Sequence, residues 1–357
     1  MNKKTKIVIV DDCREWGGSE IWLESFIVAA EKFSDIRMFA AIDADARVQS
    51  IVTDRFFMPI YGKNLASLKG LFRMILPILW SSFIFFKKNL KEKPDVIVCN
   101  DCYALITVQL YAKIFRIEVI FIAHGLGLTW SRAVRILIGC ADRIIAVGES
   151  VAGQFDWLRD RVTVIRAAVS VPIIAVDQPI SRGRLVFIGR LSPEKRIDLL
   201  LTAFASAVRI TPMTLEIFGD GALRPNLETL AKELGIINLI TFHGFVPSPW
   251  GKIAGSNAMC MVSSSEGAPL SIIEAQMSRV PVAAYALPSI QEMVQDGITG
   301  VLSESDSVDG IAAMLQKIVG MNDYDLKNMA QNALDFANFN YSKKKFEDNI
   351  FNFFKKT

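Results

Sequence analysis

Short runs of apolar, mostly β-branched residues alternate with longer amphipathic stretches along almost the whole chain. Continuous apolar runs are typical of strands buried on both faces, and such strands separated by helices indicate parallel sheets. The runs that predict strands are 6–10, 95–98, 119–122, 143–147, 162–165, 185–188, 214–218, 239–242, 258–262 and 282–284. The pattern therefore predicts an α/β protein.

The predicted strands form two sets, separated by residues 170–183, which contain two prolines and few helix formers. We expect two doubly wound, Rossmann-like domains at 1–170 and 184–340, joined by a linker at 171–183. A C-terminal helix at 341–357 is expected to pack back on the N-terminal domain. The length of 357 residues suits two domains. Because parallel sheets bind ligands beyond the carboxyl ends of their strands, two such sheets predict a central cleft.

The most informative stretch is 263–281, SSSEGAPLSIIEAQMSRVP. Glu266 and Glu274 stand eight positions apart, which on a helix is just over two turns, so they share roughly one face. Small residues at 267–269 precede an apolar helical run, 270–277. Such a turn presents free N–H groups and a positive dipole end, which suit a phosphate. A carboxylate inside the helix can accept hydrogen bonds from hydroxyls, so a sugar nucleotide suits both features.

Two cations follow the predicted strand 185–188. Arg190 and Lys195 lie in the next loop, on either side of Pro193. Two positive side chains at the carboxyl end of a strand can neutralise a diphosphate. The alternative is a solvated loop, because single basic residues often have no further role.

Three further loops are candidates from their positions alone. Gly17 and Gly18 follow the first strand and open a helix, so their N–H groups can meet a phosphate, although a plain tight turn is an equal alternative. His124 ends a strand, but a lone histidine is more often structural. His243 suits a structural role as well as a functional one. The backbone of the loop 243–250 could lie along the edge of a nucleotide's base.

The composition excludes several classes of function. A hydrophobic fraction of 51% supports a large core, and a net charge of +3 does not by itself imply nucleic-acid binding. Five cysteines argue against a disulfide framework and for a reducing compartment. Cys99 and Cys102 form a C-x-x-C, but no second pair follows, so redox or zinc chemistry is disfavoured. The apolar run at the N-terminus is too short for a signal peptide.

Dinucleotide chemistry is also disfavoured. In HGLGLTW and GDGALR, Trp130 and Arg224 occupy the place of the third glycine of the dinucleotide fingerprint, and no GK[ST] phosphate loop is present. The sequence therefore argues against a nicotinamide dehydrogenase.

Residues 63–93 differ in composition from the rest of the chain. They carry seven Lys or Arg and one Glu around an apolar run at 74–86. This run is shorter than the roughly 20 residues needed to span a bilayer. Basic flanks with Trp80 and several phenylalanines suit a helix lying in an anionic membrane surface. The alternative is a buried core helix with solvated basic ends.

Taken together, these stretches resemble the retaining glycosyltransferases of family 4, which have the GT-B architecture. The resemblance covers nearly the whole chain and is strongest from 185 to 302. It rests on GRL-x-x-EK at 189–195, FGDG at 218–221, HGFV at 243–246, E-G-x-P-x4-E-A at 266–275, the Pro281-Val282 pair, Glu292 and DGITGVL at 296–302. Each motif is modest alone, but their order and spacing are specific.

The resemblance implies roles for individual residues. Arg190 and Lys195 match the pair of cations that holds the donor's diphosphate. Glu274 matches the carboxylate that binds the ribose. Glu266 matches the carboxylate that contacts the donor sugar. His124 matches a histidine near the reacting centre. The resemblance thus places Glu266, His124, Arg190 and Lys195 in catalysis. Donor binding is assigned, besides Arg190, Lys195 and Glu274, to Gly17, Gly18, Gly219, Phe245, Val246, Gly267, Ala268, Pro269 and Leu270.

Two departures from the family pattern stand out. Pro288 and Ser289 replace a Gly-Gly pair shortly before Glu292, which puts the geometry of that loop in doubt. Arg279 or Val280 occupies the place of a glycine before the Pro-Val pair, a change that we expect to be tolerated.

The resemblance implies a nucleotide-sugar-dependent hexosyltransferase that builds cell-surface polysaccharide or glycolipid. The donor is a UDP-, GDP- or other nucleotide sugar, and the acceptor is a glycan or a lipid-linked molecule. No metal and no cofactor are expected, because the cations can stabilise the leaving diphosphate and no D-x-D motif ends a strand. We expect a cytoplasmic protein, peripheral on the inner face of the membrane. A sugar-nucleotide epimerase and a catalytically degenerate binding or scaffold subunit are the alternatives.

Overall fold

The computed structural model describes residues 4–12, 17–41, 50, 53–56, 68–126, 131–169 and 179–355. The chain divides into two compact units. The first unit contains Met1–Ala167 and Lys344–Thr357, and the second contains Ala168–Lys343. This division lies close to the boundary expected at residue 170. Residues 170–178 of the expected linker lie outside the described residues.

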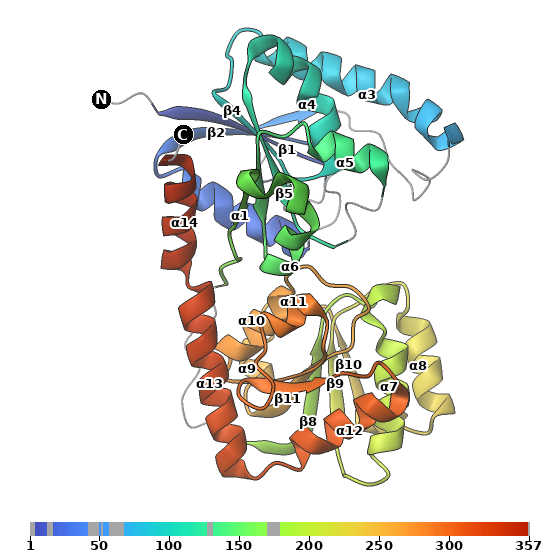
Figure 1. The fold of residues 1–357 in the computed structure, drawn as a ribbon. Coiled ribbons are helices and arrows are strands. Elements are labelled where there is room, and N and C mark those ends of the chain that lie inside the picture. Colours follow the sequence, from blue (N-terminus) through green and yellow to red (C-terminus); the bar gives the residue numbers. More distant parts are fainter. Residues whose placement is uncertain are drawn as a thin grey trace. The chain divides into compact units, whose positions relative to one another are not determined.

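The first unit is built on a seven-stranded parallel sheet with the order β3-β2-β1-β4-β5-β6-β7 (Figure 1). Its central strands are apolar at nearly every position, and β4 is buried throughout, as strands covered on both faces require. The strands are β1 (Thr5–Asp11), β2 (Ser34–Ala41), β3 (Asp54–Phe56), β4 (Val96–Cys99), β5 (Glu118–Ala123), β6 (Arg143–Ala146) and β7 (Val162–Val164).

Helices connect and cover these strands. They are α1 (Gly18–Ala30), α3 (Leu68–Asn89), α4 (Cys102–Phe115), α5 (Arg132–Ile138), α6 (Glu149–Ala152), the 3-10 helix η2 (Gly153–Arg161) and the C-terminal α14 (Lys343–Lys355). Aromatic side chains fix α14 in the first unit. Phe346 meets Trp22 of α1 edge to face, with 5.5 Å between ring centroids. Arg143 of β6 lies over the ring of Phe353 and donates to its backbone carbonyl at 2.7 Å.

The second unit has a six-stranded parallel sheet with the order β10-β9-β8-β11-β12-β13 (Figure 1). Its strands are β8 (Ser181–Ile188), β9 (Thr214–Phe218), β10 (Ile240–Gly244), β11 (Ser256–Met261), β12 (Val282–Tyr285) and β13 (Gly300–Ser303). Its helices are η3 (Pro193–Lys195), α7 (Ile197–Ala207), α8 (Arg224–Glu233), η4 (Ile237–Leu239), α9 (Trp250–Ile253), α10 (Leu270–Met277), α11 (Pro288–Gln291), α12 (Val308–Val319) and α13 (Asp323–Tyr341).

The structure confirms the predicted α/β class with two parallel sheets, and every predicted strand is present. Three strands were missed. β2 carries Asp35 and Arg37, which interrupt its apolar run, β3 is a three-residue edge strand, and β13 opens with Gly300. All three lie at or next to a sheet edge, where the continuous apolar signal of a central strand is weakest.

Residues 68–89 of the unusual segment 63–93 form α3, which contains Pro77. Within the described residues, no helix combines the length and apolar character needed to cross a bilayer. Residues 63–67 lie outside the described part of the chain.

Candidate functional site

In both units the predicted site residues follow strand ends. Gly17, Gly18 and His124 belong to the first unit, and the other predicted site residues to the second. In the second unit they lie on the segments after β8, β9, β10 and β11, and these strands are neighbours in one sheet. The parallel arrangement therefore gathers their loops at one edge.

The best-defined contact of the site joins Lys195 to Glu266. The Nζ atom of Lys195 donates to Oε1 of Glu266 at 2.6 Å, and the two side chains are only 18% and 9% exposed. The residues lie 71 positions apart in the sequence. Because the pair is largely shielded from water, its electrostatic attraction is stronger than that of a surface ion pair.

Backbone contacts hold the same two loops together. The N–H of Ser264 donates to the carbonyl oxygen of Glu194 at 2.8 Å. Although burial opposes it, a hydrogen bond from Ser192 and the positive charges of Lys195 and Arg190 lower the pKa of the Glu194 carboxyl. Arg190 is exposed. Thus both predicted cations belong to one charged loop, and that loop is fixed to the segment that carries Glu266.

Gly219 approaches β8 more closely than any other residue type could. A Cβ atom at Gly219 would lie 1.8 Å from the carbonyl oxygen of Gly189, and one at Gly221 would lie 2.5 Å from that of Leu191. The N–H of Gly219 donates to Gly244 at 2.8 Å, and the N–H of Gly189 donates to Phe218 at 3.0 Å. The glycines of FGDG therefore connect the carboxyl ends of β8, β9 and β10.

Beyond β10, Phe245 is 63% exposed and Val246 is half-buried.

Beyond β11, α10 starts after Pro269, and no described side chain caps its first turn. Gly267 and Ala268 precede it, and their N–H groups have no acceptor among the residues that the structure describes. Leu270, the first helical residue, is buried. These N–H groups and the positive helix end are available to an anion.

Glu274 lies inside α10 and is half-buried. Its carboxyl group has no hydrogen-bond partner among the described residues, and burial raises its pKa to about 7. A desolvated carboxyl without donors is costly to ionise. The arrangement is therefore suited to a ligand that brings its own donors, such as a diol.

We expect Glu274→Gln to stabilise the second unit only when the pH is high. The folded pKa of about 7 exceeds the ordinary 4.5, so the native state keeps a proton that the unfolded state loses between these values. Stability conferred by that proton is complete below 4.5 and is lost as the pH rises through 7. Above pH 7, glutamine should raise the free energy of unfolding by about 2 kcal/mol.

Urea unfolding near pH 4.5 and well above pH 7 measures this difference. The control is Glu233→Gln at an exposed position on α8. Its effect on the free energy of unfolding should be the same at both pH values. Equal effects of Glu274→Gln at the two pH values would contradict the assignment of a raised pKa.

In the first unit, His124 follows β5 and lies against the ring of Trp22, edge to face, at 5.6 Å. Its Nε2 atom is 2.7 Å from Oδ1 of Asn100. Burial lowers the pKa of His124 to about 4, so the ring is neutral near pH 7. Gln154 donates to the carbonyl oxygen of Gly125 at 3.0 Å, which fixes the backbone directly after the histidine.

Gly18 is the first residue of α1 and Gly17 precedes it as the N-cap, as predicted for a helix start. The N–H of Gly17 donates to the Glu20 carboxylate at 2.8 Å, and Ser19 donates to the same carboxylate at 2.6 Å. Glu20 is 5% exposed. The helix thus supplies its own anion to Gly17, and a phosphate would meet Gly18 rather than the already bonded Gly17.

Other candidates have structural roles. His243 stacks on Phe218 with 4.3 Å between ring centroids, and its Nε2 is 2.8 Å from Oε2 of Glu216. Burial, followed by the charge of Asp101, raises the pKa of the Cys102 thiol to about 12, and burial likewise raises that of Cys99. Such thiols are poor nucleophiles and poor metal ligands. Among the described residues, no His, Cys, Asp and Glu group could hold a metal ion.

Both departures from the family pattern have local explanations. Pro288 and Ser289 form the first turn of α11, where proline needs no N–H. Arg279 adopts a left-handed φ of 57° just after α10, and the N–H of the next residue, Val280, donates to Ala275 at 2.9 Å. Glycine usually occupies this helix-ending position. Arg279 is held there by a hydrogen bond to the side chain of Gln331.

Sequence reasoning missed Asn100 and Asp101. Asn100 contacts His124, while Asp101 caps α4 by accepting from the N–H groups of Tyr103 and Ala104 at 2.6 and 2.8 Å. The available signal was the pair of polar residues directly after an apolar strand. The C-x-x-C motif on either side of this pair drew the interpretation toward the cysteines instead.

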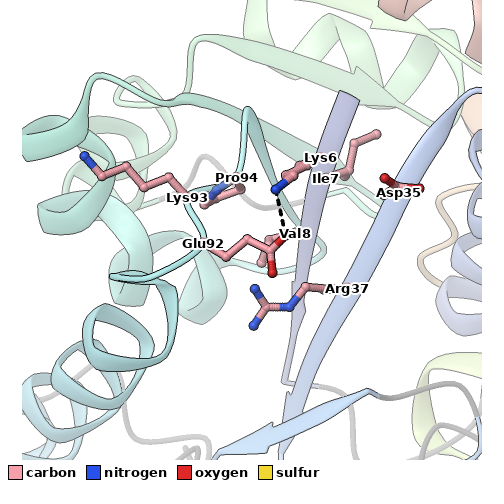
Figure 2. Close-up of a pocket in the computed structure, with 8 residues that line it drawn as sticks. All are labelled: Lys6, Ile7, Val8, Asp35, Arg37, Glu92, Lys93 and Pro94. Atoms are coloured by element: carbon pink, nitrogen blue, oxygen red, sulfur yellow. Dashed lines mark hydrogen bonds and ion pairs between the residues drawn. The ribbon is translucent and has the colours of Figure 1, made fainter. Parts of the chain in front are cut away.

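A small cavity lies at the opposite, amino edge of the first unit's sheet (Figure 2). It is lined by Lys6, Ile7, Val8, Asp35, Arg37, Glu92, Lys93 and Pro94. Figure 2 shows Lys6 reaching Glu92, with 2.7 Å between Nζ and Oε1. Its volume of about 40 Å³ holds only a few water molecules. We do not assign the site to this cavity, since ligands of parallel sheets bind at the other edge.

Comparison with known families gives two matches. The family described as Glycosyltransferase Family 4 matches residues 38–171, and the family described as Glycosyl transferases group 1 matches residues 174–335. The two matches fall on the two halves of the chain, and the second covers all of the predicted loops after β8, β9, β10 and β11.

Individual relatives agree with these matches. The D-inositol 3-phosphate glycosyltransferase of Thermomonospora curvata is 30% identical over 212 residues, 50% of this chain and 49% of that protein. The chain thus spans about half the length of this relative. The lipopolysaccharide 1,6-galactosyltransferase of Salmonella typhimurium is 25% identical over 252 residues, 66% of this chain and 68% of that protein. The crystal structure of Anabaena HepE in complex with UDP and glucose has the same fold, with a TM-score of 0.80, 18% identity, and coverage of 99% of this chain and 100% of that one.

Proposed function

Because the chain belongs to the glycosyl transferases group 1 family, we propose that it is a retaining glycosyltransferase that moves a sugar from a nucleoside diphosphate to a glycan or lipid-linked acceptor. The observation that carries this proposal is the shielded Lys195–Glu266 pair, connected to the uncapped start of α10. The relatives that act in inositol-phosphate and lipopolysaccharide glycosylation favour polysaccharide or glycolipid synthesis. They also favour transfer over the alternative of epimerisation.

The diphosphate of the donor would bind between the charged loop after β8 and the start of α10. Lys195 and Arg190 supply positive charge, and the N–H groups of Gly267 and Ala268 supply donors. When the sugar–oxygen bond breaks, negative charge develops on the diphosphate and positive charge at the anomeric carbon. Fixed cations and N–H groups stabilise the first of these, while Glu266 contacts the sugar. In a retaining transfer the acceptor attacks the anomeric carbon from the same face that the diphosphate leaves. The departing diphosphate takes the proton of the acceptor hydroxyl.

Glu274 would receive the two ribose hydroxyls. A diol that donates to this carboxyl favours its ionised form, because hydrogen bonds to a charged group lower its pKa. Since burial holds the pKa at about 7 without a ligand, donor binding near neutral pH should release a proton. A nucleotide whose ribose lacks both hydroxyls should bind without that release, and calorimetry in buffers of different ionisation enthalpy measures the difference.

The experiment that tests the proposed function is a panel of nucleotide sugars. Each nucleotide sugar is scored by the thermal stabilisation of the protein and by slow hydrolysis of the bond between its sugar and its diphosphate. One donor at about a hundred times its dissociation constant should stabilise the folded state by about 2.7 kcal/mol. Stabilisation without hydrolysis or transfer would favour the degenerate binding subunit. No stabilisation by any nucleotide sugar would contradict the proposal.

The membrane is the proposed place of action, and α3 is the surface that would meet it. Four large apolar side chains recur at helical spacing along α3: Leu76, Leu79, Trp80 and Phe83, which are 76%, 57%, 56% and 58% exposed. Trp80 and Phe83 stack on each other at 6.0 Å, whereas Phe85 on the other face is fully buried. Basic residues end the helix, with Lys87 exposed. An apolar stripe with basic ends suits an anionic lipid surface.

We expect the double variant Trp80→Ser, Phe83→Ser to bind vesicles of anionic lipid at least about tenfold more weakly, since burial of each aromatic side chain contributes roughly 1.5–3 kcal/mol. Co-sedimentation measures the binding. The control is Ile210→Ser, which removes a 77% exposed apolar side chain from the second unit and should leave binding intact. Equal binding by the double variant and the wild type would contradict membrane association through α3.

A further inference from the structure

Three neighbouring strands of the first unit end in side chains that form a hydrogen-bonded series. Asp11 is the last residue of β1, Asn100 directly follows β4, and His124 directly follows β5. Nδ2 of Asn100 donates to Oδ1 of Asp11 at 3.2 Å, and Oδ1 of Asn100 lies 2.7 Å from Nε2 of His124. Asp11 and Asn100 are 1% and 5% exposed, so these two members of the series lie in the protein interior, whereas His124 is half-buried.

The series has only one consistent orientation. A carboxylate only accepts hydrogen bonds, so Asp11 must face the amide nitrogen of Asn100. The carbonyl oxygen of Asn100 then faces His124, and this oxygen can only accept. Consequently Nε2 of His124 carries the hydrogen. In a neutral imidazole the second nitrogen, Nδ1, is then an acceptor with a free lone pair.

The surroundings keep this arrangement rigid. The N–H of Asn100 donates to the carbonyl oxygen of Val10 at 3.0 Å, which fixes the backbone of Asn100 against β1. Trp22 lies edge to face against the histidine ring, at 5.6 Å. Among the described residues, no group donates to Nδ1 of His124. Asp101, the nearest further acid in the sequence, is engaged by the backbone N–H groups of Asp12, Tyr103 and Ala104.

We infer that Asn100, oriented by Asp11, is a positioning residue that fixes His124 as the Nε2–H tautomer and leaves Nδ1 to accept a hydrogen bond from a hydroxyl of a bound sugar. The last part rests on the proposed function, because a sugar substrate supplies the hydroxyl. The tautomer itself is a property of the ligand-free protein.

Nitrogen NMR of protein labelled in its histidine rings tests the tautomer directly. The chain contains only two histidines, and His243→Gln leaves a single ring to observe. The ring of His124 should carry its hydrogen on Nε2 and should stay neutral around pH 6.5, where a free histidine is half protonated. A hydrogen on Nδ1, or titration near pH 6.5, would overturn the inference.

Variants separate positioning from simple packing. Asp11→Asn replaces a side chain that only accepts by one that can also donate, so Asn100 can then bind it in either orientation. Because the variant does not touch His124, a mixture of the two tautomers should appear. Asn100→Ala should give the same mixture and should lower donor-dependent turnover roughly tenfold or more. A single unchanged tautomer in both folded variants would overturn the inference, and if neither variant folds, the wild-type spectrum decides.

The failure of the proposed function has a different signature. In that case the wild-type ring is the Nε2–H tautomer, but no nucleotide sugar stabilises the protein or is turned over. Conversely, turnover of a donor by a protein whose His124 carries its hydrogen on Nδ1 supports the proposed function and overturns the positioning role of Asn100.

Discussion

Lys195→Ala is expected to lower donor-dependent turnover by about 10²–10³-fold, on the scale of losing one fixed group that stabilises transition-state charge. Lys195 is the shielded cation of the site, held 2.6 Å from Glu266. A diphosphate that binds beside it would meet a positive group that is already in place. Because that charge matters most when the diphosphate leaves, kcat should fall more than the affinity for the donor.

Lys232→Ala is the control for this variant, since it removes an exposed lysine from α8 in the same unit. It should retain wild-type turnover. Glu266→Gln and the double variant complete a cycle. If Lys195 and Glu266 act only on each other, donor-dependent turnover by the double variant should be no lower than turnover by the less active single variant. Wild-type kcat in Lys195→Ala would contradict the assignment of the diphosphate site to the loop after β8.

The fold was predictable because parallel sheets buried on both faces leave a strong signal. Strands such as β4 and β11 are buried at every position, so hydrophobicity alone locates them. The same physics explains the strands that were missed. β2 keeps Arg37 half-buried through an ion pair with Asp54 at 3.0 Å, and no local pattern reveals a partner 17 positions away.

The site was predictable as a set of loops but not as a set of contacts. Motif spacing placed Lys195 and Glu266 after two predicted strands, whereas their pairing depends on β8 and β11 being neighbours in the sheet. The raised pKa of Glu274 could not be predicted from the sequence either, because it depends on how completely the rest of the fold covers α10. Asn100 was missed since an asparagine after a strand is common, and its role depends on which side chains end the adjacent strands.

Gly219→Ala is expected to destabilise the second unit by about 3–5 kcal/mol. The added Cβ would lie 1.8 Å from the carbonyl oxygen of Gly189, a backbone atom that cannot rotate away. Ordinary overpacking of a core costs about 1–3 kcal/mol. Here β8 and β9 must also separate, which weakens the hydrogen bonds from Gly219 to Gly244 and from Gly189 to Phe218, each contributing roughly 0.5–1.5 kcal/mol.

Hydrogen exchange of peptides covering β8 and β9 measures this loss within the second unit, independently of the first. Gly251→Ala is the matched control. No described atom lies within 4 Å of the Cβ that it adds, and Gly251 is helical in α9, so alanine there should be neutral or stabilising by about 0.5–1 kcal/mol. A Gly219→Ala protein with wild-type exchange would show that the strand ends can separate freely. The Lys195 loop, which Gly189 and Gly219 fix to the sheet, would then lack the rigidity that a preorganised diphosphate site requires.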